Sequence, residues 1–326
     1  MSYFKLGFGP MSPLIVDIMA GYAVKHERPL MIIASRNQVD ASSGYVMSTA
    51  ELARQLENYP RSHLRLCRDH CGPYFLDSEK SLSLRQAIEA TKKTIATDIA
   101  LGFDLIHIDT SRCEDPYLVA DELFNYALKL NPDVAFEFGT EENVGVAAGI
   151  KKFKQDVEFV RHFPNVEFVV AQTGSLTYED RQAGTFDVNA VTELVKYAEL
   201  AGVKLKEHNA DYLTSEQIQL RRTAGVHALN IAPQLGVIQT RTLLHLATMY
   251  AEDSTQFKNT IIDSMKWSKW TKSRRADLRA LVAGHYCFNT DAYYELVGRI
   301  NQKHNFEETV KTNIEQCLDQ YYTNLY

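Results

Sequence analysis

Eight short apolar segments recur along this chain, and each is followed by a longer stretch with the periodicity of an amphipathic helix. Strands that are apolar on both faces are typical of parallel sheets covered by helices. The predicted strands are Lys5–Gly9, Leu30–Ser35, Leu64–Arg68, Leu105–Asp109, Ala135–Phe138, Glu167–Ala171, Lys204–Glu207 and Val226–Ile231. Eight β–α units in succession favour the α/β class and, within it, a closed eight-stranded parallel (β/α)8 TIM barrel.

Residues that start and end helices delimit the segments between these strands. Pro13 suits a first helical turn, and Gly102, Gly202 and Gly225 each follow an apolar-periodic stretch, as C-terminal caps do. The predicted helices are Pro13–His26, Thr49–Glu57, Ser83–Leu101, Pro116–Leu130, Phe153–His162, Val188–Ala201, Thr214–Ala224 and Val237–Tyr250. A doubly wound open sheet is the competing architecture, but the sequence contains neither a glycine-rich dinucleotide turn nor a P-loop.

The β–α rhythm stops near residue 253. The remaining sequence has helical character and many aromatic residues, including Trp267 and Trp270. We therefore expect a barrel over residues 1–253 and a C-terminal helical extension over residues 254–326. The extension would pack on the barrel or make a subunit contact, and we expect the protein to form a homo-oligomer.

Composition narrows the classes of function. The 326 residues carry a formal net charge of -6 without a dominant basic cluster, which argues against nucleic acid as the main partner. No apolar run reaches the ~20 residues of a membrane span, and the first ten residues lack the pattern of a signal peptide. Five scattered cysteines fit reduced thiols, so we expect a cytoplasmic protein with no membrane partner.

Polar side chains gather where the predicted strands end, and the C-terminal strand ends form the active site of a β/α barrel. His70, Glu137 and His208 come from three different strands. Two imidazoles and a carboxylate would hold a divalent cation and leave a position open for water or substrate. Zn²⁺ is the expected ion, with Mn²⁺ or another divalent ion as the alternative. Each of these histidines alone would more often be a hydrogen-bonded structural residue.

Further strand-end residues are candidates for catalysis and substrate binding. Asp69, beside His70, is expected to move a proton, and Asp109 and Glu142 to orient the imidazoles that bind the metal. The predicted substrate-binding residues are Ser35, Asn37, Gln38, Gln172, Ser175, Asn209 and Asn230. His107 alternates with apolar neighbours, so we interpret it as a core histidine rather than a ligand.

Several of these segments together resemble a known family. They are Ser35-Arg36-Asn37-Gln38, Arg68-Asp69-His70-Cys71-Gly72-Pro73, Glu137-Phe138-Gly139-Thr140-Glu141 and His208-Asn209-Ala210-Asp211-Tyr212. The chain resembles the class II D-tagatose-1,6-bisphosphate aldolase accessory-subunit family, once labelled tagatose-6-phosphate kinase. The resemblance covers most of residues 5 to 236 and implies a catalytic aldolase chain as a partner. No nucleotide-binding loop supports the kinase label.

More distantly, the chain resembles the zinc-dependent class II fructose-bisphosphate aldolases. That resemblance implies that Asp69 transfers protons and that His70 and His208 bind zinc. It implies further that Glu137 is a ligand or supports one, and that Ser35 and Asn230 contact the substrate.

Two departures from the aldolases bear on the site. The aldolases carry another zinc-binding histidine after the sixth strand, where this chain has Gly174-Ser175-Leu176-Thr177. They also have a glycine-rich phosphate loop, where this chain has the acidic Asp211. An acid there would repel a phosphate unless its charge were compensated.

The expected activity is that of a metal-dependent aldehyde-lyase of the aldolase type. It would act on a ketose or ketose phosphate through an enediolate, with cleavage or formation of a C–C bond. One alternative is a non-catalytic accessory subunit of a tagatose-bisphosphate aldolase, which the missing histidine favours. Another is a sugar or sugar-phosphate epimerase or isomerase that uses the same metal site.

Overall fold

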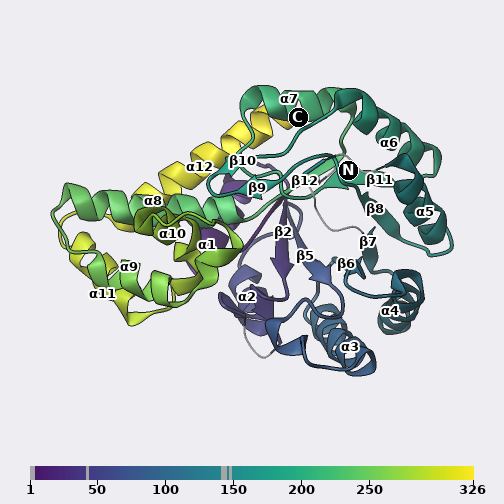
Figure 1. Ribbon diagram of the computed structural model, residues 1–326, viewed down its shortest axis with the longest axis horizontal. Helices are drawn as coiled ribbons and strands as arrows, with labels where there is room; N and C mark the ends of the chain where they lie inside the picture. The colour runs from purple at the N-terminus through teal and green to yellow at the C-terminus, as the bar shows by residue number, and fades with distance from the viewer. Residues whose placement is uncertain (1–3, 42–43, 141–144, 147–148) are drawn as a thin grey trace.

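Eight parallel strands close into a barrel in the computed structural model of the protein, which describes residues 4–41, 44–140, 145–146 and 149–326 (Figure 1). Around the barrel the strands follow the order β1, β12, β11, β8, β7, β6, β5, β2. The strands are β1 (Leu6–Phe8), β2 (Leu30–Ser35), β5 (Leu64–Cys71), β6 (Leu105–Asp109), β7 (Ala135–Gly139), β8 (Val166–Val170), β11 (Lys204–Glu207) and β12 (Ala228–Ile231). The predicted (β/α)8 barrel is thus confirmed.

Helices connect successive barrel strands and cover the outside of the barrel (Figure 1). They are α1 (Pro13–Lys25), α2 (Thr49–Leu56), α3 (Leu84–Ala100), α4 (Pro116–Leu130), α5 (Ile150–Val160), α6 (Val188–Leu200), α7 (Ser215–Ala224) and α8 (Pro233–Met249). Two small ribbons lie in the connections, one of β3 (Val39–Asp40) with β4 (Met47–Ser48), the other of β9 (Thr177–Tyr178) with β10 (Arg181–Gln182). A short 3-10 turn, η1 (Asp77–Glu79), precedes α3.

Two predicted helix starts were wrong. Helix α5 begins at Ile150 rather than Phe153, and α8 begins at Pro233 rather than Val237. In α8 the proline occupies the first turn, where its missing N–H costs no hydrogen bond. Gly236, which we took for the end of a loop, lies inside the helix because a Cβ there would lie 2.7 Å from Cβ of His285.

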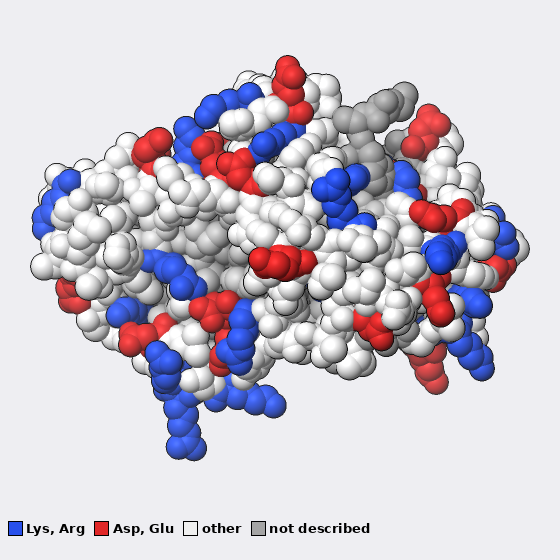
Figure 2. Space-filling view, turned by 90° about the horizontal axis from the view of Figure 1, so that it is seen from above, with Lys and Arg blue, Asp and Glu red and all other residues white. Residues whose placement is uncertain are grey.

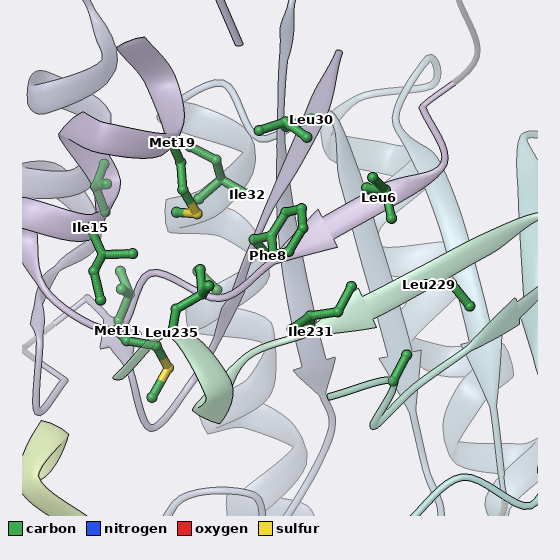
Figure 3. Packing of buried hydrophobic residues seen from close by; sticks show 14 of the residues in the cluster. Leu6, Phe8, Met11, Ile15, Met19, Leu30, Ile32, Leu229, Ile231 and Leu235 are labelled. Atoms are coloured by element: carbon green, nitrogen blue, oxygen red, sulfur yellow. The ribbon is translucent and has the colours of Figure 1, made fainter. Parts of the chain in front are cut away.

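Side chains of the barrel strands alternate between two apolar cores. The outer core lies between strands and helices and contains Phe8, Ile15, Ile32 and Leu235, all fully buried (Figure 3). The inner core fills the barrel with Met31, Ile33, Cys67, Leu105, Phe168 and Ala228. Because side chains two apart on a strand share a face, polar residues that follow these positions line the mouth above them.

The C-terminal helices are α9 (Thr255–Asp263), α10 (Ala276–Ala283), α11 (Asp291–Asn301) and α12 (Phe306–Leu325), with the 3-10 turns η2 (Lys266–Lys269) and η3 (Gly284–Cys287). Helices α9 to α11 gather beside α8, at one side of the barrel (Figure 1). The long α12 returns along the barrel and packs against α1, α7 and α8 (Figure 1). The division into two units at residue 253 stays a prediction.

The surface carries mixed charge. On the face shown in Figure 2, Lys and Arg side chains are interspersed with Asp and Glu. Within the described ranges, no helix combines the length and the apolar character that crossing a membrane requires. All five cysteines are free thiols, as the sequence predicts.

Candidate metal centre

A bulge in β5 brings two neighbouring residues, Asp69 and His70, to the same mouth of the barrel. Consecutive side chains of a regular strand point to opposite faces. The pairing of β5 with β6 is interrupted between Arg68 and Cys71, and His70 adopts a left-handed backbone with a φ of 47°. Such bulges redirect side chains next to functional sites. Asp69 and His70 both line the cavity at this mouth as a result.

Three imidazoles surround the Asp69 carboxylate. Its Oδ1 lies 3.2 Å from Nδ1 of His107 and 3.8 Å from Nδ1 of His208, and its Oδ2 lies 3.6 Å from Nε2 of His70. One potential ligand atom of each of these four residues lies within 4.8 Å of the others. This donor set of three imidazoles and one carboxylate fits a divalent transition metal such as zinc.

Asp109 orients the His70 ring. Its Oδ2 lies 2.6 Å from Nδ1 of His70, while Oδ1 accepts hydrogen bonds from the Ser111 hydroxyl and backbone N–H. Enclosure by the cavity walls opposes protonation, but the charge of Asp69 and the contact with Asp109 raise the pKa of His70 to about 9. Metal binding would therefore displace a proton from His70 at neutral pH.

Glu137 performs the same role for His208. Its Oε1 lies 2.6 Å from Nε2 of His208, and its Oε2 accepts a 2.6 Å hydrogen bond from Lys206. Burial lowers the pKa of His208 against the opposing charges of Asp69 and Glu137, which favours the neutral imidazole that binds metals. Both oxygens of Glu137 thus have protein partners. This arrangement resembles a group that orients a ligand more than the ligand that the sequence predicts.

His107 joins the cluster, although the sequence pattern led us to interpret it as a core histidine. It is 2% exposed, and its ring centroid lies 5.4 Å from that of His70 and 5.1 Å from that of His208. Its Nε2 has no hydrogen-bond partner within the described part of the chain. The signal was present in the sequence: His107 lies two residues before Asp109 on one strand, so both point to the barrel interior.

A cavity of about 1120 Å³ opens above the cluster. Of the predicted substrate-binding residues, six line it: Ser35, Asn37, Gln38, Gln172, Asn209 and Asn230. The extension closes its far side with residues that the sequence analysis did not single out as site residues, among them Lys266, Lys269 and Tyr286. These share no motif with the barrel residues and follow them by many positions.

Some predicted site residues serve the scaffold or fall outside the described chain. Ser175 is buried and donates a 2.6 Å hydrogen bond to the backbone carbonyl of His208. Gln38 lines the cavity, but its Oε1 accepts from the backbone N–H of Ser35 at 2.9 Å. Glu142 lies outside the described residues.

The N-terminus of α8 also faces the cavity. Oδ1 of Asp211 accepts hydrogen bonds from the backbone N–H groups of Ala232 at 3.0 Å and Gln234 at 2.9 Å. Burial raises the pKa of Asp211 to about 7 in spite of these two amides. A side chain of this protein therefore takes the position that barrel enzymes often use for a phosphate.

Comparison with a family model supports one part of the resemblance stated above. Residues 10–127 match the family described as D-tagatose-1,6-bisphosphate aldolase subunit GatZ/KbaZ-like. The match spans a little over a third of the chain and includes Asp69, His70, His107 and Asp109. The predicted family resemblance is confirmed for this segment.

Solved structures share the fold over nearly the whole chain. A probable tagatose 6 phosphate kinase from Sinorhizobium meliloti 1021 matches with a TM-score of 0.81 and 17% identity, over 98% of this chain and 100% of that one. A fructose-bisphosphate aldolase from Campylobacter jejuni matches with a TM-score of 0.61 and 10% identity, over 99% and 91%. A fructuronate-tagaturonate epimerase from Cohnella laeviribosi matches with a TM-score of 0.59 and 11% identity, over 98% and 81%.

Proposed function

We propose, from the likeness of residues 10–127 to the tagatose-bisphosphate aldolase subunit family, that this chain is a metal-dependent aldolase-type lyase. It would cleave or form a C–C bond in a ketose or ketose phosphate. The observation that carries the proposal is the group of three imidazoles around Asp69, two of which have a second nitrogen held by a carboxylate. Carboxylate-supported histidines of this kind are typical of functional metal sites.

His70, His107 and His208 would hold the ion, with Asp69 within reach of it. A bound divalent cation supplies a Lewis acid that polarises a carbonyl and stabilises the charge of an enediolate. Asp109 and Glu137 keep the rings of His70 and His208 in the orientation and tautomer that binding needs. Lys206 keeps Glu137 ionised and in place.

Asp69 is the proton-transferring group of this proposal. The charges of His70 and His208 outweigh burial and hold its pKa well below the usual range, so it is a carboxylate at neutral pH. A carboxylate there would take the proton of a hydroxyl at the cleaved bond and return it to the aldehyde oxygen in the reverse reaction. Gln172 and Asn230 line the cavity and would hydrogen-bond sugar hydroxyls.

An accessory role is the second candidate, because the matched family is described as an aldolase subunit. In that role the chain would support a separate catalytic chain. The complete set of oriented imidazoles favours chemistry in this chain, since a site without a function has no need of a carboxylate behind each ligand.

The test uses the full-length chain, stripped with a chelator and reloaded with one equivalent of Zn²⁺. D-Tagatose 1,6-bisphosphate and D-fructose 1,6-bisphosphate are offered, and triose phosphate release is followed by a coupled dehydrogenase assay. We expect release that requires the metal, and a loss of about 100-fold or more in Asp69→Asn with zinc still bound. Arg274→Gln, an exposed charge change outside the cavity lining, is the matched control.

The alternatives give different results in the same assay. No turnover by the chain alone, with increased turnover when a catalytic aldolase chain is added, would assign the accessory role. Interconversion of ketoses without triose phosphate would assign an epimerase.

A further inference from the structure

Two cations on the wall of the cavity come from distant parts of the chain. Arg112 follows β6, and Lys269 ends η2 in the C-terminal extension. They lie close enough that enclosure by the cavity walls and the charge of Arg112 lower the pKa of Lys269. Like charges repel, so a fold that holds two cations together needs a compensating anion.

No such anion is present among the residues that the structure describes. Neither Arg112 nor Lys269 has a carboxylate oxygen within 4.0 Å in the described ranges, whereas Lys266, in the same turn as Lys269, lies 3.1 Å from Asp77. Arg112 donates one hydrogen bond to the backbone carbonyl of Tyr74 at 2.7 Å, which leaves other N–H groups of its guanidinium for a ligand.

The usual place for an anion in a barrel of this kind is filled from within. The Asp211 carboxyl occupies the N-terminus of α8 and accepts the hydrogen bonds of Ala232 and Gln234. A phosphate of the ligand would meet a carboxyl group there instead of free amides. An anionic group on the ligand therefore needs another site in the cavity.

We propose that Arg112 and Lys269 form a subsite for an anionic group, a phosphate or a carboxylate, at the end of the ligand remote from the histidine cluster. The subsite rests on the proposed function in one respect, because the ligand is the one that reacts at the cluster. It differs from the proposed function in that it binds the anion through the chain's own cations.

Stacked rings set the position of the subsite relative to the cluster. The Arg112 guanidinium lies 4.2 Å from the ring centroid of Phe75, and Phe75 stacks on His70 with centroids 5.3 Å apart and planes 11° from parallel. One aromatic layer therefore separates Arg112 from a cluster imidazole. A ligand that reaches both places must carry its anionic group several bonds from the reacting carbons.

The experiment measures binding of inorganic phosphate to the full-length, metal-stripped protein by titration calorimetry. Without metal, phosphate cannot bind through the ion, so the result does not depend on the proposed function. We expect saturable binding, weakened about tenfold or more in both Lys269→Gln and Arg112→Gln, because each removes a charge-assisted hydrogen bond. Lys258→Gln, also in the extension but paired with Asp277 outside the cavity lining, should bind phosphate as the unmodified protein does.

Competition with acetate separates the two kinds of anion. Displacement of phosphate at similar acetate concentrations supports a carboxylate-binding subsite, and resistance supports a phosphate-binding one. The proposal is overturned if the metal-free protein binds no phosphate, or if both variants bind it unchanged while retaining the unmodified melting temperature. Loss of zinc binding or of aldol cleavage, with phosphate binding intact, would refute the proposed function alone.

Discussion

Glu137 lies 2.6 Å from His208 through Oε1 and Nε2, and so fixes a cluster imidazole from the side opposite Asp69. Lys206, fully buried, holds the other oxygen of Glu137. A row of charged groups inside the barrel thus ends at the candidate metal centre.

Replacement of Glu137 by Gln should weaken zinc binding by about 10- to 100-fold, because His208 loses its charged partner but stays in place. Competition with a chromophoric chelator measures the affinity. Glu158→Gln, an exposed change on α5, is the control. Complete loss of zinc would instead show that Glu137 is itself a ligand, as the sequence alone predicts.

His107→Leu should lower zinc affinity by about 100-fold or more, since it removes one of three imidazoles. His285→Leu is a matched control, because His285 is also a buried imidazole, and its ring nitrogens have no hydrogen-bond partner among the described residues. It lies outside the four-residue cluster. Equal zinc affinities of the two variants would return His107 to the core role that its sequence pattern indicates.

Asp211→Asn should change how stability depends on pH. The pKa of Asp211, about 7, lies above its ordinary value of 3.8, so the folded state binds more protons than the unfolded state between these pH values. Its contribution to the free energy of unfolding therefore falls as pH rises from about 4 to about 7. Asparagine keeps an oxygen for the amides of Ala232 and Gln234 but does not titrate.

Urea unfolding at pH 4.5 and pH 8 tests this expectation on metal-free protein. Relative to the variant, the unmodified protein should lose on the order of 3 kcal/mol across the interval, at about 1.4 kcal/mol per pKa unit. Other titrating groups are common to both proteins and cancel in the difference. Parallel stability curves for the two proteins would rule out the raised pKa.

Two glycines in helices should respond to alanine in opposite directions. In Gly236→Ala the new Cβ would lie 2.7 Å from Cβ of His285, and we expect a loss of about 1–3 kcal/mol from overpacking. In Gly21→Ala, in α1, the new Cβ meets no atom within 4 Å, and we expect a gain of about 0.5–1 kcal/mol. Thermal unfolding of both variants measures the effect, and a destabilised Gly21→Ala would contradict it.

The barrel could be predicted because its signals are local. Apolar runs at regular spacing, with glycine after the helices, locate all eight barrel strands within a few residues. The same alternation places Asp109 in the mouth, and applied to His107 it would have placed that residue there too. The prediction erred where one residue had two local interpretations, as at Gly236, which suits both a loop end and a crowded helix.

The sequence by itself determined the order of strands and helices and the strand ends where polar residues gather. These follow from side-chain periodicity, a property of a few consecutive residues. The tertiary structure alone decided which atoms meet. The bulge that turns His70 beside Asp69, the Lys206 contact that occupies Glu137, and the Asp211 carboxyl at α8 all depend on barrel closure and on partners distant in sequence.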